Sequence, residues 1–280
     1  MPELPETETI ARDLDAAVSG ATIVGADVAR PSVLREVDAG ALARRVAGVR
    51  VRRAWRRAKL VVIDLASEDR IVVQPRFTGA LLVEPPPGDG SGLAARERGF
   101  VRVSFRLDDG RALHYRDIRC LGTVALMTPA RFEGYAAALG PEPLAPEFTA
   151  ARLHATLGAS RQAVKKVLMD QRRLVGVGNI YANEALWRAR VAPERPARSL
   201  SRREATRLRD AVVGVLAESI ALRGTSFRDY VDARGERGGF VDRLAVYGRA
   251  DAPCPRCGRA LAGTHAVDGR ATVWCPRCQR

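Results

Sequence analysis

The chain has 280 residues, 46% of them hydrophobic, and carries a formal net charge of +14. That hydrophobic fraction is ordinary for a folded globular protein and excludes a mainly disordered chain. A chain this basic is expected to bind a polyanion, first nucleic acid and second an acidic membrane surface. No apolar run approaches the roughly 18 residues of a membrane span, and the acidic start lacks the regions of a signal peptide, so we expect a cytoplasmic protein.

The first predicted element is an acidic helix that ends near Val18. Pro2 follows an initiator methionine that is expected to be trimmed, which would leave a secondary amine. An α-amino group has a pKa about two to three units below that of lysine, so more of it is neutral and nucleophilic near pH 7. Glu3 and Glu6 lie within reach for proton transfer. The same residues also suit an ordinary helix start, since proline and acidic side chains favour the first turn.

A run of short β-rich segments follows, and several alternate between apolar and polar residues as half-buried strands do. So many strands in about 110 residues predict a sandwich or barrel rather than βαβ units. The expected strands are Thr22–Ala29, Val46–Trp55, Leu60–Leu65, Arg70–Val73, Ala80–Val83, Phe100–Leu107, Arg111–Tyr115 and Thr123–Met127. Residues 84–92, rich in proline and glycine, predict an exposed loop.

From about Ala130 to Arg223 the apolar residues recur every three or four positions, which predicts a helical unit. Within it, a helix, a turn with two glycines and a second helix opening at Asn179 are expected. The Asn179 side chain suits a helix cap, and the neighbouring backbone N–H groups suit a phosphate. Taken alone, this pattern also fits any helical hairpin.

Four of the five cysteines form two C-x-x-C pairs separated by 17 residues: Cys254, Cys257, Cys275 and Cys278. This spacing predicts one structural, four-thiolate zinc site that does no chemistry itself. A pair of disulfides is the alternative, and the lack of a secretion signal disfavours it. The arginines around the pairs predict a basic hairpin for a DNA groove, although a zinc ribbon can equally bind protein. The fifth cysteine, Cys120, is expected to be a small buried residue.

Taken together, these motifs resemble bacterial formamidopyrimidine-DNA glycosylase, a family that also includes endonuclease VIII-like enzymes. The resemblance runs in order from one end of the chain to the other. It rests on the opening Pro2–Glu6, Arg56–Lys59, Gly140–Leu144, Leu174–Ala182, Val246–Arg249 and the cysteine pairs. It implies an α+β multidomain fold: an N-terminal helix with a β-sandwich (1–130), a helix-two-turns-helix domain (131–235) and a zinc ribbon (236–280).

The resemblance also implies an activity. The protein would be a bifunctional glycosylase and lyase of base excision repair that removes 8-oxoguanine and formamidopyrimidines. Pro2 would form an iminium with the deoxyribose C1′, and β- and δ-elimination would follow. Glu3 would transfer protons and Glu6 would shape the site. The partner would be double-stranded DNA with oxidised bases or abasic sites, bound by a monomeric, cytoplasmic protein that associates with the bacterial nucleoid.

Further residues match the family's DNA contacts. Lys59 would contact phosphate, which suits one of only three lysines among 46 basic residues. Asn179 and Arg270 would clamp the phosphates beside the lesion, and Lys59 and Arg270 both belong to the catalytic set as well. Lys165 is assigned to DNA binding. Tyr247 is assigned there too, although a packed aromatic suits its position nearly as well.

The loops that fill the space left by a flipped nucleotide depart from the family pattern. Phe77 stands where a methionine is expected, and Leu121 replaces a phenylalanine beside the retained Arg119. Position seven, commonly valine, is Thr7. The lesion-covering loop is expected near residues 225–240, where Arg228 would meet phosphate.

Because of the altered loops, a non-catalytic DNA-binding protein on the same scaffold is one alternative. An endonuclease VIII-like specificity for oxidised pyrimidines is another, disfavoured by Leu4, which follows the purine-enzyme form of the opening motif.

Overall fold

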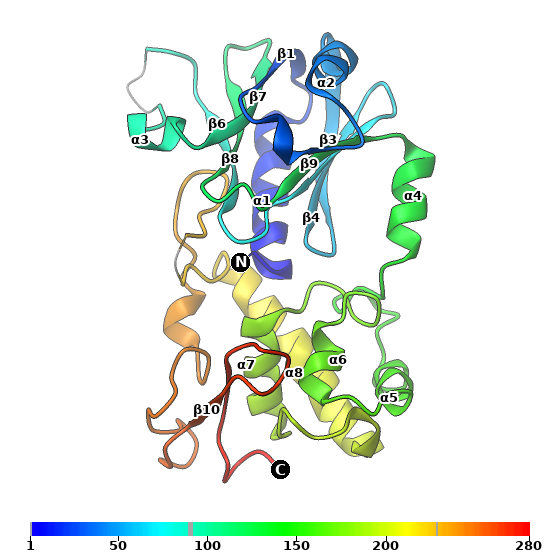
Figure 1. Cartoon of the computed structure of the whole chain (residues 1–280), viewed down its shortest axis with the longest axis vertical. Helices are drawn as coiled ribbons and strands as arrows, with labels where there is room; N and C mark the ends of the chain where they lie inside the picture. Colours follow the sequence, from blue (N-terminus) through cyan, green and yellow to red (C-terminus); the bar gives the residue numbers. More distant parts are fainter. Residues whose placement is uncertain (1, 89–91, 228) are drawn as a thin grey trace. The chain divides into compact units, whose positions relative to one another are not determined.

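The computed structural model describes residues 2–88, 92–227 and 229–280 (Figure 1). The chain forms two compact units. The first consists of residues up to Ala137 together with Leu222–Gly239, and the second of Ala138–Ala221 together with Phe240–Arg280. The cysteine pairs therefore share a unit with the helices, and the three-part division at 130 and 235 stays a prediction. Among the described residues, no helix is long and apolar enough to cross a membrane.

The first unit combines a long N-terminal helix with a large antiparallel sheet. Its elements are α1 (Leu4–Val18), β1 (Thr22–Val28), η1 (Pro31–Val33), β2 (Leu34–Arg35), α2 (Ala39–Val46), β3 (Val49–Arg57), β4 (Leu60–Leu65), β5 (Arg70–Gln74), β6 (Gly79–Glu84), α3 (Ala95–Arg98), β7 (Val101–Leu107), β8 (Ala112–Asp117), β9 (Thr123–Met127) and α4 (Pro129–Ala137).

The strands follow the order β2-β9-β5-β4-β3-β1-β7-β8-β6, with only the short β2–β9 pair parallel. Two halves meet where β3 pairs with β1 through Thr22–Arg50 and Ile23–Val49. One buried cluster contains apolar residues of both halves, such as Ile63 of β4 and Phe105 of β7. Because both halves bury their apolar residues in this shared cluster, the predicted α+β class with a β-sandwich is confirmed.

Helix α1 supplies a third part of the same core. Ile10, Leu14 and Val18 recur at helical spacing and are all buried in the cluster. Pro5 lies in the first turn, where a missing N–H has no cost, and the helix ends at Val18, with Ser19 at the C-cap. The predicted N-terminal helix therefore has the expected end, and its apolar stripe holds its N-terminus at a fixed place on the sheet.

The expected strand from Val46 to Trp55 needs correction. Val46 instead ends α2, which Asp38 caps by accepting a hydrogen bond from the Ala41 N–H at 2.7 Å, and β3 begins only at Val49. A capped eight-residue helix escaped sequence reasoning because its short apolar pattern also fits a strand.

The second unit is mainly helical and ends in a small β-hairpin. Its elements are α5 (Ala150–Gly158), α6 (Val164–Met169), α7 (Asn179–Ala189), η2 (Ala197–Ser199), α8 (Arg202–Ala221), η3 (Phe240–Arg243), β10 (Ala262–Thr264) and β11 (Thr272–Trp274). Helices α6 and α7 flank a turn that holds Gly176 in the left-handed region (φ 81°). The predicted helix, glycine turn and second helix are present.

Candidate active site and nucleic-acid interface

Glu3 and Glu6, the two carboxylates beside Pro2, are buried in the first unit, with exposed fractions of 2% and 1%. Pro2 is buried too. One carboxylate oxygen of Glu6 accepts the Glu3 backbone N–H at 2.8 Å, and the other accepts the Thr225 N–H at 2.8 Å. Glu6 therefore fixes the backbone immediately after Pro2.

Thr7 has a local structural account. Its buried hydroxyl donates to the Glu3 carbonyl at 2.8 Å and lies 3.1 Å from the Leu4 carbonyl oxygen and 3.5 Å from that of Ala58. A threonine that bonds back to the preceding turn is tolerated in a helix. The hydroxyl therefore joins the first turn of α1 to the residue before Lys59.

Lys59 lies in the turn between β3 and β4, where it is half-buried. Arg56 ties this turn to α1: it donates to Glu8 at 2.8 Å and to the Ala58 carbonyl at 3.0 Å. Burial acts to raise the pKa of Glu8, but the hydrogen bonds and charges of Arg56 and Arg12 hold it below its ordinary value. The ion pair therefore keeps the Lys59 turn at the N-terminal end of α1.

The two altered loops bring their predicted side chains together at the surface. Phe77 and Leu121 are 44% and 40% exposed, unusual for large apolar residues. The Arg119 guanidinium carbon lies 5.3 Å from the centre of the Phe77 ring, within the range of a cation–π contact. Cys120, expected to be buried, is half-buried against the core.

Sequence reasoning missed Asp117, the buried residue that ties these loops together. Its carboxylate accepts hydrogen bonds from the Thr78 hydroxyl at 2.5 Å, the Tyr115 hydroxyl at 3.0 Å and the Gly122 N–H at 2.8 Å. Burial and the nearby Asp117 charge raise the pKa of Tyr115. The sequence feature that could have pointed to Asp117 is an aspartate at the end of a strand, followed by a loop that ends at Gly122.

Asn179 is the first residue of α7, and Gly178 occupies the cap position, so the expected capping role for Asn179 is wrong. Its side-chain amide instead donates to the Ala271 carbonyl at 3.1 Å. Arg270, next to Ala271, is exposed, and its only described ion pair is a long one of 3.6 Å to Asp268. Helix α7 therefore holds the turn that presents the Arg270 guanidinium.

Lys165, which we assigned to DNA binding, is buried in the second unit. It is 0% exposed, and its ammonium donates to the Ala271 carbonyl at 3.0 Å and to the Thr272 hydroxyl at 2.6 Å. A buried ammonium with these partners supports the hairpin rather than facing solvent. The signal that would have found this role is its place among the apolar residues of α6.

Tyr247 is half-buried, and its backbone is held by Glu184, which sequence reasoning also missed. The buried Glu184 carboxylate accepts the backbone N–H groups of Ala245, Val246 and Tyr247 at 2.8–2.9 Å.

Arg228, assigned to phosphate binding, lies outside the described residues.

The four paired cysteines converge in the second unit: their sulfur atoms all lie within 4.8 Å of one another. Cys257 and Cys275 have sulfurs 3.5 Å apart. Tetrahedral coordination with Zn–S bonds of about 2.3 Å separates neighbouring sulfurs by about 3.8 Å. The donor set and its spacing therefore form a possible metal site.

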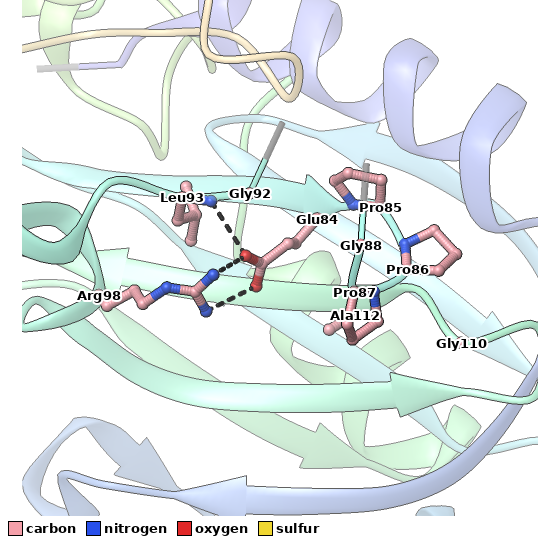
Figure 2. Close-up of a pocket in the computed structure, with 10 residues that line it drawn as sticks. All are labelled: Glu84, Pro85, Pro86, Pro87, Gly88, Gly92, Leu93, Arg98, Gly110 and Ala112. Carbon is pink, nitrogen blue, oxygen red and sulfur yellow. Dashed lines mark hydrogen bonds and ion pairs between the residues drawn. The ribbon is translucent and has the colours of Figure 1, made fainter. Parts of the chain in front are cut away.

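A separate pocket of about 460 Å³ lies between the end of β6 and the loop after it (Figure 2). In it, both oxygens of Glu84 are engaged: one accepts the Leu93 N–H at 3.0 Å, and Arg98 and His114 donate to the other at 3.2 and 2.7 Å. None of the predicted site residues lines this pocket. It is therefore a structural feature apart from the candidate site.

Comparisons with known proteins agree with this geometry. Residues 1–124 match the family model of the formamidopyrimidine-DNA glycosylase N-terminal domain, and residues 139–231 match its H2TH domain. Similar proteins include the formamidopyrimidine-DNA glycosylases of Moorella thermoacetica, 42% identical with 93% of each chain covered, and Thermomicrobium roseum, 42% identical with 94% and 93% covered.

Two solved structures extend the likeness to the fold. MutM (Fpg) from Thermus thermophilus superposes with a TM-score of 0.86 at 38% identity, covering 99% of this chain and 98% of that one. Lactococcus lactis Fpg in complex with abasic-site DNA gives 0.90 at 27% identity, with 99% of each chain covered. The fold and the matches define a DNA-repair enzyme of the DNA glycosylase class. The chain belongs to the formamidopyrimidine-DNA glycosylase family.

Proposed function

We propose that this chain is a bifunctional DNA glycosylase and abasic-site lyase that removes oxidised purines, 8-oxoguanine and formamidopyrimidines among them. The observation that carries the proposal is the burial of Glu3 and Glu6 directly beside Pro2. Two buried carboxylates are costly unless they are hydrogen-bonded, and Glu6 has backbone partners for both of its oxygens. Its role is to hold the backbone, while Glu3 lies next to the amine for proton transfer.

The reaction begins when removal of Met1 leaves Pro2 with a secondary amine. The amine attacks C1′ of the damaged nucleotide, the bond from C1′ to the base breaks, and the base leaves with a proton supplied within the site. Loss of the amine proton and opening of the sugar ring give an iminium in which C1′ is bonded to the Pro2 nitrogen. Glu3 handles the proton at the sugar.

The iminium is an electron sink, so the C2′ proton becomes acidic. Its removal expels the phosphate on the 3′ side, and a second elimination expels the phosphate on the 5′ side. Lys59 and Arg270 would hold phosphates without reading sequence, since such contacts position DNA rather than specify bases. Hydrolysis then frees Pro2 from the sugar fragment.

The wedge residues Phe77, Arg119 and Leu121 would occupy the gap left by the flipped nucleotide. Flipping costs a few kcal/mol, and apolar side chains in the stack offset part of that cost. Exposure of Phe77 and Leu121 on neighbouring loops supports this role. Asn179 and Tyr247 would contact the same DNA from the second unit.

Zinc is the metal that suits the four cysteines, because four thiolates with short mutual distances match a closed structural site. The site would hold one ion per chain and stabilise the hairpin that carries Arg270. We also infer a monomer, by analogy with the family.

Borohydride trapping tests the proposal. Protein beginning at Pro2 is mixed with duplex DNA containing 8-oxoguanine opposite cytosine, an oxidised pyrimidine or an abasic site, and borohydride reduces any imine to a stable complex. We expect trapping on the first and third duplexes, and strong suppression of turnover by Pro2→Gly and Glu3→Gln. Trapping on none would contradict the proposed enzyme activity, and preference for the pyrimidine would indicate the endonuclease VIII-like alternative.

A further inference from the structure

The segment Leu222–Gly239 returns to the first unit after the helices of the second. Its two ends, residues 222–225 and 238–239, lie against each other and form what we call the stem. The Gly239 N–H donates to the Leu222 carbonyl at 2.8 Å, and Thr225 and Gly239 form an isolated antiparallel β-bridge. A Cβ on Gly238 would lie 2.3 Å from the Gly224 carbonyl oxygen, so this crossing requires glycine. The stem therefore brings two backbones into direct contact.

Arg223, in the left-handed region at φ 62°, carries a clamp at the base of this stem. Its guanidinium donates to Asp232 at 2.9 Å and to Asp13 of α1 at 2.6 Å. Both carboxylates are buried, and Asp232 also accepts the N–H groups of Arg234 and Glu236 at 2.9 Å. Burial acts to lower the pKa of Arg223, but the two aspartates raise it above its ordinary value.

The residues after Arg223 touch the candidate site. Gly224 has φ +88°, and a Cβ there would lie 3.1 Å from both Cγ and Oε1 of Glu6. Thr225 donates its N–H to Glu6, which accepts the Glu3 N–H through its other oxygen. A continuous set of contacts therefore runs from the clamp to the backbone beside Pro2.

We propose that Asp13, Arg223 and Asp232 form a positioning clamp that holds Gly224 and Thr225 against Glu6, and thereby fixes the backbone of Pro2 and Glu3 for attack on C1′. The inference rests on the proposed function. None of the three touches the reacting atoms, so they are positioning residues. Loss of the clamp is expected to slow the reaction, because a displacement of about 1 Å between reacting groups can lower a rate by two orders of magnitude.

Arginine suits this place better than lysine does. Its planar fork bonds two carboxylates on different elements at once, whereas a lysine ammonium is a single point charge on a flexible stem. Arg223→Lys keeps the charge beside the buried aspartates and so limits the cost of leaving them unpaired. It removes the fixed geometry, which is the property under test.

Two measurements on Arg223→Lys and Asp13→Asn test the clamp. The first is the single-turnover rate of borohydride trapping on 8-oxoguanine duplex, compared with the Kd for a duplex carrying a tetrahydrofuran abasic analogue. We expect trapping to slow about tenfold while Kd changes less than about twofold. Asp27→Asn is the matched control, because it breaks an exposed pair of the same unit, Asp27 with Arg106 at 2.7 Å, and is expected to change neither value.

The second measurement is amide hydrogen exchange of the DNA-free protein, which does not depend on catalysis. Both variants are expected to exchange the Glu3 and Thr225 amides at least several-fold faster than the wild type, whereas Asp27→Asn leaves them unchanged. Unchanged exchange at these amides would overturn the clamp, as would trapping at the wild-type rate or a loss of rate matched by weaker binding. A wild-type protein that is never trapped would instead refute the proposed function, and the exchange result would still decide the clamp.

Discussion

The guanidinium of Arg119 lies over the ring of Phe77, 5.3 Å from its centre, although the two residues belong to different loops. The contact pairs a cation with an aromatic side chain that is nearly half exposed. Cation–π pairs contribute about 0.5–1 kcal/mol at exposed sites, so this contact orders two surface side chains but adds little to the free energy of unfolding. In the proposed wedge, the contact would hold both side chains ready to enter the DNA.

Phe77→Ala is expected to slow excision of 8-oxoguanine about tenfold while cleavage of a preformed abasic site falls less than about threefold, because only the first reaction requires a paired base to be extruded. Single-turnover kinetics on the two duplexes measure the difference. Val24→Ala serves as the control, since Val24 is another exposed apolar residue of the same unit. Equal losses on both substrates would argue against a wedge.

Asp117→Asn tests the support under the same loops. The amide cannot accept from all four donors that now meet the carboxylate, the Arg119 N–H among them, so buried hydrogen-bonding groups lose partners. We expect a loss of about 2 kcal/mol and a fall of roughly 4–8 °C in the unfolding midpoint, read by circular dichroism. Thermal stability equal to wild type would show that the loops do not depend on this residue.

Lys165→Met and Arg270→Ala separate a buried support from a proposed phosphate contact. The logarithm of the DNA-binding constant falls linearly with the logarithm of the salt concentration, and each lost phosphate contact makes this slope about 0.9 less steep. Arg270→Ala is expected to reduce the slope by this amount. Lys165→Met is expected to leave the slope unchanged even where affinity falls, because the Lys165 ammonium donates to the Ala271 carbonyl and the Thr272 hydroxyl. A less steep slope in Lys165→Met would instead support the DNA-binding role first predicted for Lys165.

Glu204, at the start of α8, makes part of the stability depend on pH. Its hydrogen bond with Arg195 lowers its pKa to about 2, from an ordinary value of 4.5. A depressed pKa stabilises the folded state above pH 4.5, and this contribution is lost as the pH falls toward 2. Since solvent screens the pair, Glu204→Gln is expected to cost about 1 kcal/mol at pH 7.

The difference between wild type and Glu204→Gln should shrink as urea unfolding is repeated from pH 7 down to pH 3. Glu147→Gln, which removes an exposed carboxylate of the same unit, provides the comparison. A difference independent of pH would place the effect in the hydrogen bonds of Glu204 with Ser201 rather than in its charge.

Metal removal tests the cysteine site. Chelation is expected to release about one zinc per chain and to abolish DNA binding, while the sandwich of the first unit keeps its β-sheet circular dichroism. The physical reason is that all four cysteines lie in the second unit, together with the hairpin that the proposed zinc would stabilise. Binding that survives complete loss of metal would refute this dependence.

Local patterns in the sequence were enough for much of the fold. Apolar spacing located α1 and most strands of the sandwich, because side chains on one face of a helix or strand recur with the period of that element. Cysteine spacing located the possible metal site for a similar reason, since two short turns set the ligand geometry. Helix α2 was missed because a short apolar pattern fits either element.

Only the tertiary structure decided which polar groups are buried together. Asp117 and Glu184 read as ordinary charged residues and Lys165 as a DNA contact, yet each is buried against partners that other elements supply. The clamp joins Asp13 to Arg223 across 210 positions of the chain. Sequence periodicity reports the exposure of one element at a time, whereas such contacts depend on how separate elements pack. The chemistry proposed for Pro2, Glu3 and Glu6 rests on their order in the sequence and on the family resemblance, whereas the contacts that support them required the fold.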